Sequence, residues 1–127
     1  MEMRLQTMAG EFSILVFDRN KYIRELVKRE LELEGYKVHV ARTFHEFIGL
    51  MERPVVFKLM ILDLEVQDID QSLDLVRDKL RKSPDVTVVV HTFNEIPARL
   101  ADLDNVRFVE KNAVSVEVIK AIVRDLR

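Results

Sequence analysis

The sequence VVFKLMILD, residues 55–63, is a run of mostly apolar residues that ends in the carboxylate of Asp63. An apolar run of this length, rich in β-branched and large aliphatic residues, predicts a strand buried in a sheet. The run FSILVFD, residues 12–18, has the same form and ends in Asp18. We therefore expect two acids at the ends of two buried strands.

Two later apolar runs lead to polar side chains of a different kind. One ends in Thr92, and the other is followed, two residues past Phe108 and Val109, by Lys111. Ligands of an open α/β sheet gather just outside the carboxyl ends of its strands. Two acids, a hydroxyl and an ammonium at that edge indicate a site that handles phosphoryl groups.

Strand-like segments alternate with helix-like segments along the chain, which predicts a parallel sheet with crossover helices. The second strand carries Lys37 and His39 and is short, so we expect it at an edge of the sheet. The expected strands cover residues 12–17, 36–40, 55–62, 86–90 and 106–109.

Capping residues locate the helices between these strands. Asn20 begins the first helix and Gly35 ends it, while Thr43 opens the second with a capping box. A third helix follows the loop after Asp63, a short fourth falls within residues 94–104, and Ser115 is expected to cap the last. The expected inward residues of the first helix are Ile23, Leu26, Val27 and Leu31.

Composition limits the class of protein. The chain has 127 residues, 48% of them apolar and 33% charged, which is typical of one globular domain. A net charge of −2 argues against nucleic-acid binding driven by charge, and the lack of cysteine excludes disulfides and thiolate metal sites. No apolar stretch approaches the roughly 20 residues of a membrane span. We expect a flexible tail over residues 1–11, one domain over residues 12–127, and a cytoplasmic location.

Over residues 12–127 the sequence resembles the receiver domain of bacterial response regulators. The residues that carry the resemblance are Ile14-Leu15-Val16-Phe17-Asp18, Glu34-Gly35-Tyr36-Lys37-Val38, Ile61-Leu62-Asp63, Val90-His91-Thr92 and Phe108-Val109-Glu110-Lys111. The resemblance implies a flavodoxin-like sheet of order 2-1-3-4-5 with five helices. It also implies that Asp63 accepts a phosphoryl group from a histidine kinase, that Thr92 contacts this group, that Lys111 pairs with it, and that Phe108 is the switch aromatic.

The main departure from the family is Arg19, at a position where an acid usually binds Mg²⁺. The ligands that remain are Asp18, Asp63 and the backbone carbonyl of Glu65, so we expect Mg²⁺ to bind weakly or not at all. Two arrangements stay open. Arg19 swings to solvent and leaves a weak metal site, or it pairs with Asp63 or Asp18 and stands in for the metal.

Three smaller departures concern residues around the same pocket. Phe93 follows Thr92, where the family usually has a small residue, and would crowd phosphoryl entry. Asn112 replaces the usual proline after Lys111, and Phe108 lacks a tyrosine hydroxyl. His91 ends a buried strand and is interpreted as a core histidine with satisfied hydrogen bonds.

These observations favour a non-enzymatic signalling domain with Asp63 as phospho-acceptor. Its partners would be a histidine kinase or phosphotransfer protein and a downstream effector. The alternative is a pseudo-receiver, a binding module that Arg19 locks in one conformation. A flavin- or nucleotide-binding enzyme is least favoured, because no glycine-rich phosphate loop follows the first strand.

The last helix is expected to make a second apolar contact. Eight apolar residues between Val114 and Leu126 cover an arc of about 220°, which exceeds what packing on one side of a sheet buries. Val114, Val118 and Ala121 lie at the outer edge of that arc. We therefore expect a homodimer or a partner contact through the fifth strand and this helix.

Overall fold

A five-stranded parallel sheet forms the centre of the molecule, with strand order β2-β1-β3-β4-β5. The computed structural model describes residues 12–53, 57–64, 70–93 and 98–126. The order implied by the family resemblance is therefore confirmed, and β2 is an edge strand as expected. The strands are β1 (Ser13–Phe17), β2 (Lys37–Ala41), β3 (Phe57–Leu62), β4 (Thr87–Thr92) and β5 (Val106–Glu110).

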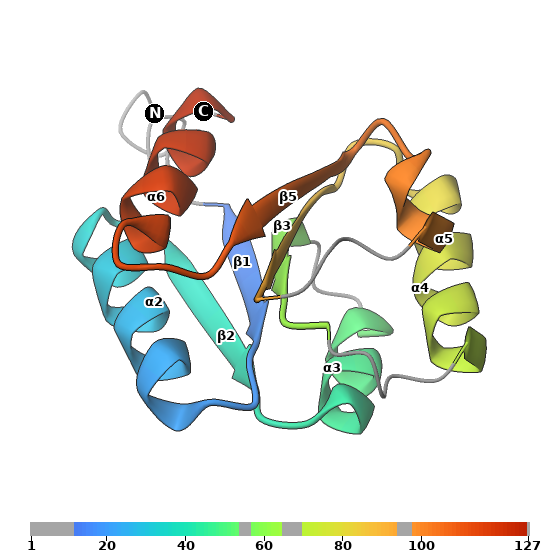
Figure 1. Cartoon of the computed structure of the whole chain (residues 1–127), viewed down its shortest axis with the longest axis horizontal. Helices are drawn as coiled ribbons and strands as arrows, with labels where there is room; N and C mark the ends of the chain where they lie inside the picture. The colour runs from blue at the N-terminus through green and yellow to red at the C-terminus, as the bar shows by residue number, and fades with distance from the viewer. Residues whose placement is uncertain (1–11, 54–56, 65–69, 94–97, 127) are drawn as a thin grey trace, which may run out of the picture.

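Helices cover both faces of this sheet (Figure 1). One face carries α2 (Lys21–Leu33) and α6 (Ser115–Asp125). The opposite face carries α3 (Phe44–Met51), α4 (Asp70–Lys82) and the single turn α5 (Ala98–Ala101). The described residues thus hold four longer helices, and the expected fourth helix is as short as its sequence predicted. None of the described helices combines the length and apolarity that a membrane crossing requires.

Side-chain alternation divides the interior into two hydrophobic cores. On β3, Leu59 and Ile61 face the α2/α6 side, whereas Met60 and Leu62 face the α3/α4/α5 side. Strands covered by helices on both faces are apolar on both faces, which is why residues 57–62 show a run rather than an alternation. Lys58 interrupts that run at a register shift between β1 and β3, where a bulge leaves it exposed.

The ends of α2 and α3 follow the sequence rules. The Asn20 side chain accepts hydrogen bonds from two amides of the first turn of α2, and Thr43 Oγ1 accepts one from the Glu46 amide. Gly35 has a φ of +97°, as a residue that ends a helix often does. Ion pairs join α2 to α6, from Lys120 to Glu30 and from Arg124 to Glu34.

Two expectations about helices were wrong. Ser115 does not cap α6; it is the first helical residue, Val114 precedes it without a side-chain cap, and the Ser115 hydroxyl is used elsewhere. On α2, Leu26 is 38% exposed, and Arg24 is buried in its place. Arg24 turns inward because its guanidinium donates to the Asp18 carbonyl at 2.9 Å.

Strand ends also differ by one to two residues from the expected ones, and Pro54, Val55 and Val56 lie outside the described residues.

Gly35→Ala should lower the free energy of unfolding, because an alanine in a left-handed conformation costs about 1–2 kcal/mol. No atom lies within 4 Å of the added Cβ, so the cost is in the backbone alone. Gly49→Ala is the matched control, because Gly49 also has open space around it but lies within a helix. It should raise stability by about 0.5–1 kcal/mol. Equal effects of the two substitutions in urea denaturation would contradict this assignment.

Candidate functional site

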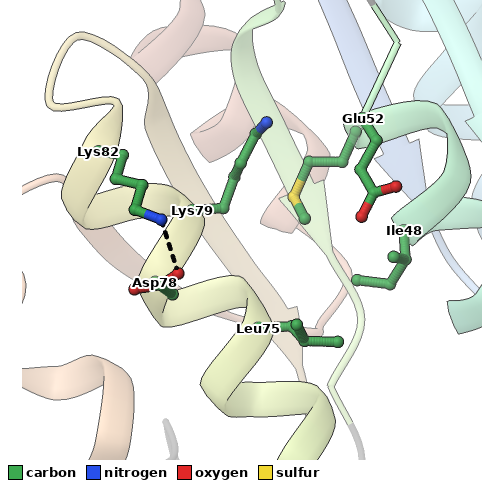
Figure 2. Close-up of a pocket in the computed structure, with 7 residues that line it drawn as sticks. Ile48, Glu52, Leu75, Asp78, Lys79 and Lys82 are labelled. Carbon is green, nitrogen blue, oxygen red and sulfur yellow. Dashed lines mark hydrogen bonds and ion pairs between the residues drawn. The ribbon is translucent and has the colours of Figure 1, made fainter.

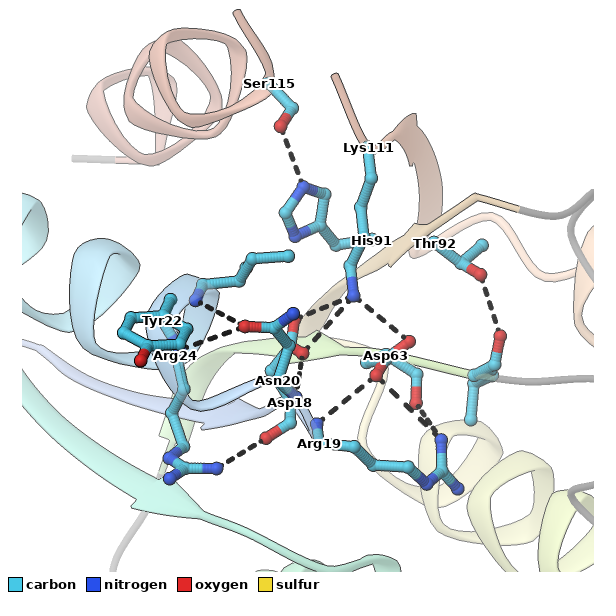
Figure 3. Close-up of polar contacts among 12 residues, drawn as sticks. Asp18, Arg19, Asn20, Tyr22, Arg24, Asp63, His91, Thr92, Lys111 and Ser115 are labelled. Carbon is cyan, nitrogen blue, oxygen red and sulfur yellow. Dashed lines mark hydrogen bonds and ion pairs between the residues drawn. The ribbon is translucent and has the colours of Figure 1, made fainter. Parts of the chain in front are cut away.

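Strand register brings the predicted polar residues to one edge of the sheet. Phe17 pairs with Leu62, and Leu62 with Val90, so the next residues, Asp18, Asp63 and His91, form a row across three neighbouring strands. Lys111 follows β5, and its amide donates to the Thr92 carbonyl at 3.0 Å. The carboxyl edge thus gathers Asp18, Asp63, Thr92 and Lys111, as the sequence predicted (Figure 3).

Lys111 connects the two acids. Its Nζ lies 3.0 Å from Asp18 Oδ2 and 3.3 Å from Asp63 Oδ1, and all three side chains are at most 4% exposed. The Asp63 Oδ1 atom is buried and accepts no hydrogen bond, although the ammonium lies beside it. The amide of Asp63 donates to the Phe17 carbonyl at 2.9 Å, which fixes the acid directly beyond the sheet.

The Asp18 side chain accepts a hydrogen bond from the Asn20 amide at 2.9 Å in addition to its contact with Lys111. Burial raises the pKa of its carboxyl, while the Asn20 amide and the Lys111 ammonium act in the opposite direction. The nearby Asp63 charge raises that pKa further. Asp18 is therefore a carboxylate whose charge depends on Lys111, because burial disfavours the ionised form.

Arg19 turns toward Asp63 rather than to solvent. Its amide donates to Asp63 Oδ2 at 3.3 Å, and its Nη1 donates to the Asp63 carbonyl at 3.3 Å and lies 3.9 Å from Oδ2. The guanidinium carbon also sits 4.9 Å from the centre of the Phe17 ring, a cation–π distance. With its side chain 33% exposed, Arg19 forms one wall of the pocket. Of the two arrangements left open by the sequence, this is the paired one.

The remaining residues that the sequence predicted at or near the site are one threonine, two phenylalanines and one glutamate. The Thr92 hydroxyl donates to the Leu64 carbonyl at 2.8 Å. Phe93, which was expected to crowd phosphoryl entry, is 67% exposed, and its ring centre lies 5.4 Å from Lys111 Nζ. Phe108 is 43% exposed on β5. Glu65, whose carbonyl was an expected metal ligand, lies outside the described residues.

The sequence predicted His91 to be a core histidine with satisfied hydrogen bonds, and the structure shows one satisfied ring nitrogen and one that is not. The ring is 2% exposed, and its Nε2 lies 2.9 Å from the Ser115 hydroxyl, while Nδ1 is buried without a hydrogen bond. Burial, and after it the neighbouring Lys111 charge, lower the pKa of His91 to about 4, although the Asp63 charge acts in the opposite direction. His91 is therefore neutral near pH 7. One feature of the sequence indicated that His91 lies near the site. It directly precedes Thr92, and side-chain alternation then places it on the same face of the sheet as Asp63.

A pocket of about 190 Å³ elsewhere contains none of these residues (Figure 2). It lies between the last turns of α3 and α4, and crossover helices run antiparallel to the strands, so it is at the edge opposite Asp63. Its rim holds charges of both signs, including the pair between Lys82 and Asp78 at 3.1 Å. Its lining consists of Ile48, Met51, Glu52, Leu75, Asp78, Lys79 and Lys82.

Solved structures with the same arrangement are receiver domains. The response regulator TrrA of Thermotoga maritima, in complex with Mg²⁺-BeF, is 27% identical, with a TM-score of 0.72 over 91% of this chain and 99% of that one. TrrA bound to the histidine kinase ThkA gives the same identity and TM-score, with 91% and 97% covered. The chain has the fold of a response regulator receiver domain.

Receiver domains of lower identity share this fold. The orphan response regulator HP1043 of H. pylori is 16% identical, with a TM-score of 0.72 over 92% of this chain and 97% of that one. No protein-family model and no curated protein sequence matches the chain. The receiver fold is thus recognised here through structure, together with the short motifs at the strand ends.

The residues of this receiver fold do not suit Mg²⁺. The ion prefers oxygen ligands in near-octahedral geometry, and the carboxylates that the described residues bring to this edge are those of Asp18 and Asp63. Both carboxylates already contact the Lys111 ammonium, and Arg19 adds a guanidinium on the other side of Asp63. No group of three or more potential metal-binding side chains occurs within the described ranges. Two fixed cations would repel a divalent ion at short range.

We expect Arg19→Asp to strengthen Mg²⁺ binding, because it replaces a repelling cation with an oxygen ligand. Calorimetric titration of the wild type should give little or no binding signal, and the variant should give a measurable one. Arg42→Asp is the control, because it makes the same charge change at a side chain that is 71% exposed and pairs with Glu46. Tight binding to the wild type, unchanged by Arg19→Asp, would refute the expectation.

Proposed function

We propose that this chain is a signalling receiver domain whose Asp63 pocket is held in one arrangement by its own cations and which works through protein–protein contacts. The observation that supports this most is the pair of side-chain cations at Asp63, with Lys111 Nζ 3.3 Å from Oδ1 and Arg19 Nη1 3.9 Å from Oδ2. A bound metal ion and a phosphoryl group would have to compete with both. The conformation is thus independent of phosphorylation.

Charge balance supports the same reading of the pocket. Two carboxylates, Asp18 and Asp63, face two side-chain cations, Lys111 and Arg19. A buried carboxylate without a partner is costly, and a receiver without metal needs another positive group beside its acceptor acid.

Partner contacts are proposed for the outer edge of α6. Val114 is 60% and Val118 43% exposed, Ala121 is exposed, and Phe108 on neighbouring β5 is 43% exposed. Phe108 pairs with Val90 and so faces the α3/α4/α5 side of the sheet. Exposed apolar side chains on one helix favour a protein contact. We define Val114, Val118 and Ala121 as the α6 edge. It would bind a second copy of the chain or an effector in the cytoplasm, with a histidine kinase or phosphotransfer protein as the upstream partner.

Phosphoryl transfer to Asp63 is the second candidate function. It is favoured by one observation, the Asp63 Oδ1 atom that accepts no hydrogen bond. In that reaction Oδ1 would attack the phosphorus of a phosphohistidine, the P–N bond would break, and the imidazole would leave with a proton from solvent. Lys111 would balance the charge on the phosphoryl oxygens.

Intact mass after incubation with acetyl phosphate and Mg²⁺ separates the two candidates. The locked pocket predicts no added phosphoryl group on the wild type and a measurable fraction of phosphorylated protein for Arg19→Asp. Asp63→Asn combined with Arg19→Asp is the control, and should abolish that gain. A wild type that gains one phosphoryl group, lost in Asp63→Asn and diminished in Lys111→Ala, would favour the second candidate instead.

Val118→Glu should weaken self-association or effector binding through the α6 edge, because a carboxylate buried in an apolar contact lacks a partner. Sedimentation velocity of the wild type should show a concentration-dependent dimer that this variant loses. Leu75→Glu is the matched control, because Leu75 is 56% exposed but lies on α4, on the opposite face of the sheet. A wild type that stays monomeric and has no partner sensitive to Val118→Glu would overturn the assignment.

A further inference from the structure

His91 and Ser115 join the Asp63 pocket to the start of α6. His91 Nε2 lies 2.9 Å from Ser115 Oγ, and both residues are buried, at 2% and 3% exposure. Ser115 is the first residue of α6, so its side chain belongs to the same turn as Val118 of the α6 edge. Figure 3 shows the ring lying between the serine and the lysine.

The hydrogen bonds around Ser115 fix the direction of this contact. The hydroxyl has one proton, and it donates to the Asn112 carbonyl at 3.0 Å. With that proton used, Ser115 Oγ accepts from His91, which requires the tautomer with hydrogen on Nε2. His91 Nδ1 then carries a lone pair, is buried, and has no hydrogen-bond donor within the described residues.

The ring also shares the electrostatic environment of the pocket. His91 is the neighbour of Asp63 in the cross-strand row, and it interacts electrostatically with both Lys111 and Asp63. A change of charge at Asp63 leaves Lys111 less compensated, and this polarises the imidazole and strengthens Nε2–H as a donor. Such effects are large in a buried network because the local dielectric is low.

The receiver pattern would suggest a different route, from Thr92 to the aromatic residue on β5. Here the Thr92 hydroxyl proton is used by the Leu64 carbonyl, and Phe108 has no hydroxyl with which to bond. Thr92 also points to the α3/α4/α5 side, because alternation along β4 turns His91 and Thr92 to opposite faces. His91 is the polar end of β4 that faces α6.

We propose that His91 and Ser115 form a polar link that transmits the charge state of the Asp63–Lys111 pair to the first turn of α6. This inference rests on the proposed function in one respect, because the α6 edge is the surface on which the link would act. His91 is a positioning residue in this scheme: it sets the geometry of Ser115 and touches no partner itself. The link replaces the Thr92 route on the opposite face of β4.

Amide hydrogen exchange in the isolated protein tests the link. Asp63→Asn changes the charge at the pocket, and the exchange rates of the Val118 and Ile119 amides report on the first turn of α6. We expect Asp63→Asn to slow these rates by at least about twofold, after normalisation to Val27 and Leu31, which report on global opening. The same substitution in a Ser115→Ala background should leave them unchanged.

Three further backgrounds provide the controls. Ser83→Ala makes the same chemical change at the end of α4 and should preserve the response. Ser115→Thr keeps the hydroxyl and should also preserve it, which separates loss of the link from general disturbance of α6. Thr92→Val should preserve it as well. A response that survives Ser115→Ala, is absent from the wild-type background, or disappears only with Thr92→Val would overturn the proposal.

Imidazole nitrogen shifts give a second measurement that a purely structural role would not move. The His91 ring should show a protonated Nε2 and an unprotonated Nδ1 at neutral pH, and Asp63→Asn should shift the Nε2 resonance. The opposite tautomer would contradict the link. Neither measurement needs a partner, so loss of the link and failure of docking through Val118 give separate results.

Discussion

The buried contact of Lys111 with Asp18 and Asp63 is the interaction on which the rest of the structure depends. It joins the ends of β1, β3 and β5 across the carboxyl edge and adds side-chain contacts to the last backbone hydrogen bonds there. Removing one partner of a buried pair of this kind costs about 3–5 kcal/mol, because the other charge is left uncompensated. The positions of Arg19 above it and of His91 beside it follow from this contact.

One helix, α6, contributes both to the polar contacts beside Asp63 and to the proposed partner surface. On the α2/α6 side, His91 contacts Ser115 at the start of α6, and ion pairs from Lys120 and Arg124 bind α6 to α2. The opposite side of β4 is apolar except for Thr92. Because side chains alternate along each strand, one face of the sheet can pack against an apolar core while the other makes polar contacts.

Much of this architecture could be predicted from local sequence. Apolar runs ending in Asp18 and Asp63 predicted both the buried strands and the acids at their ends. Strands that are buried on both faces read as continuous apolar runs, and the functional site of such a parallel sheet lies just beyond its carboxyl edge. Ser115 and Leu26 were assigned wrongly for a common reason. A cap rule and a helical period describe one element alone, whereas His91 draws the Ser115 hydroxyl inward and the Asp18 carbonyl draws Arg24 inward at the expense of Leu26. Such choices are made by tertiary contacts, which no local pattern contains.

Arg19 differs from a bound ion in one elementary way: a side chain joined to the backbone has no dissociation constant. A site that takes up a metal is filled according to the free concentration of that metal, and chelation empties it. The guanidinium beside Asp63 is present at the same effective concentration in every molecule from the time of synthesis. The positive group beside Asp63 is therefore present whatever the free concentration of metal.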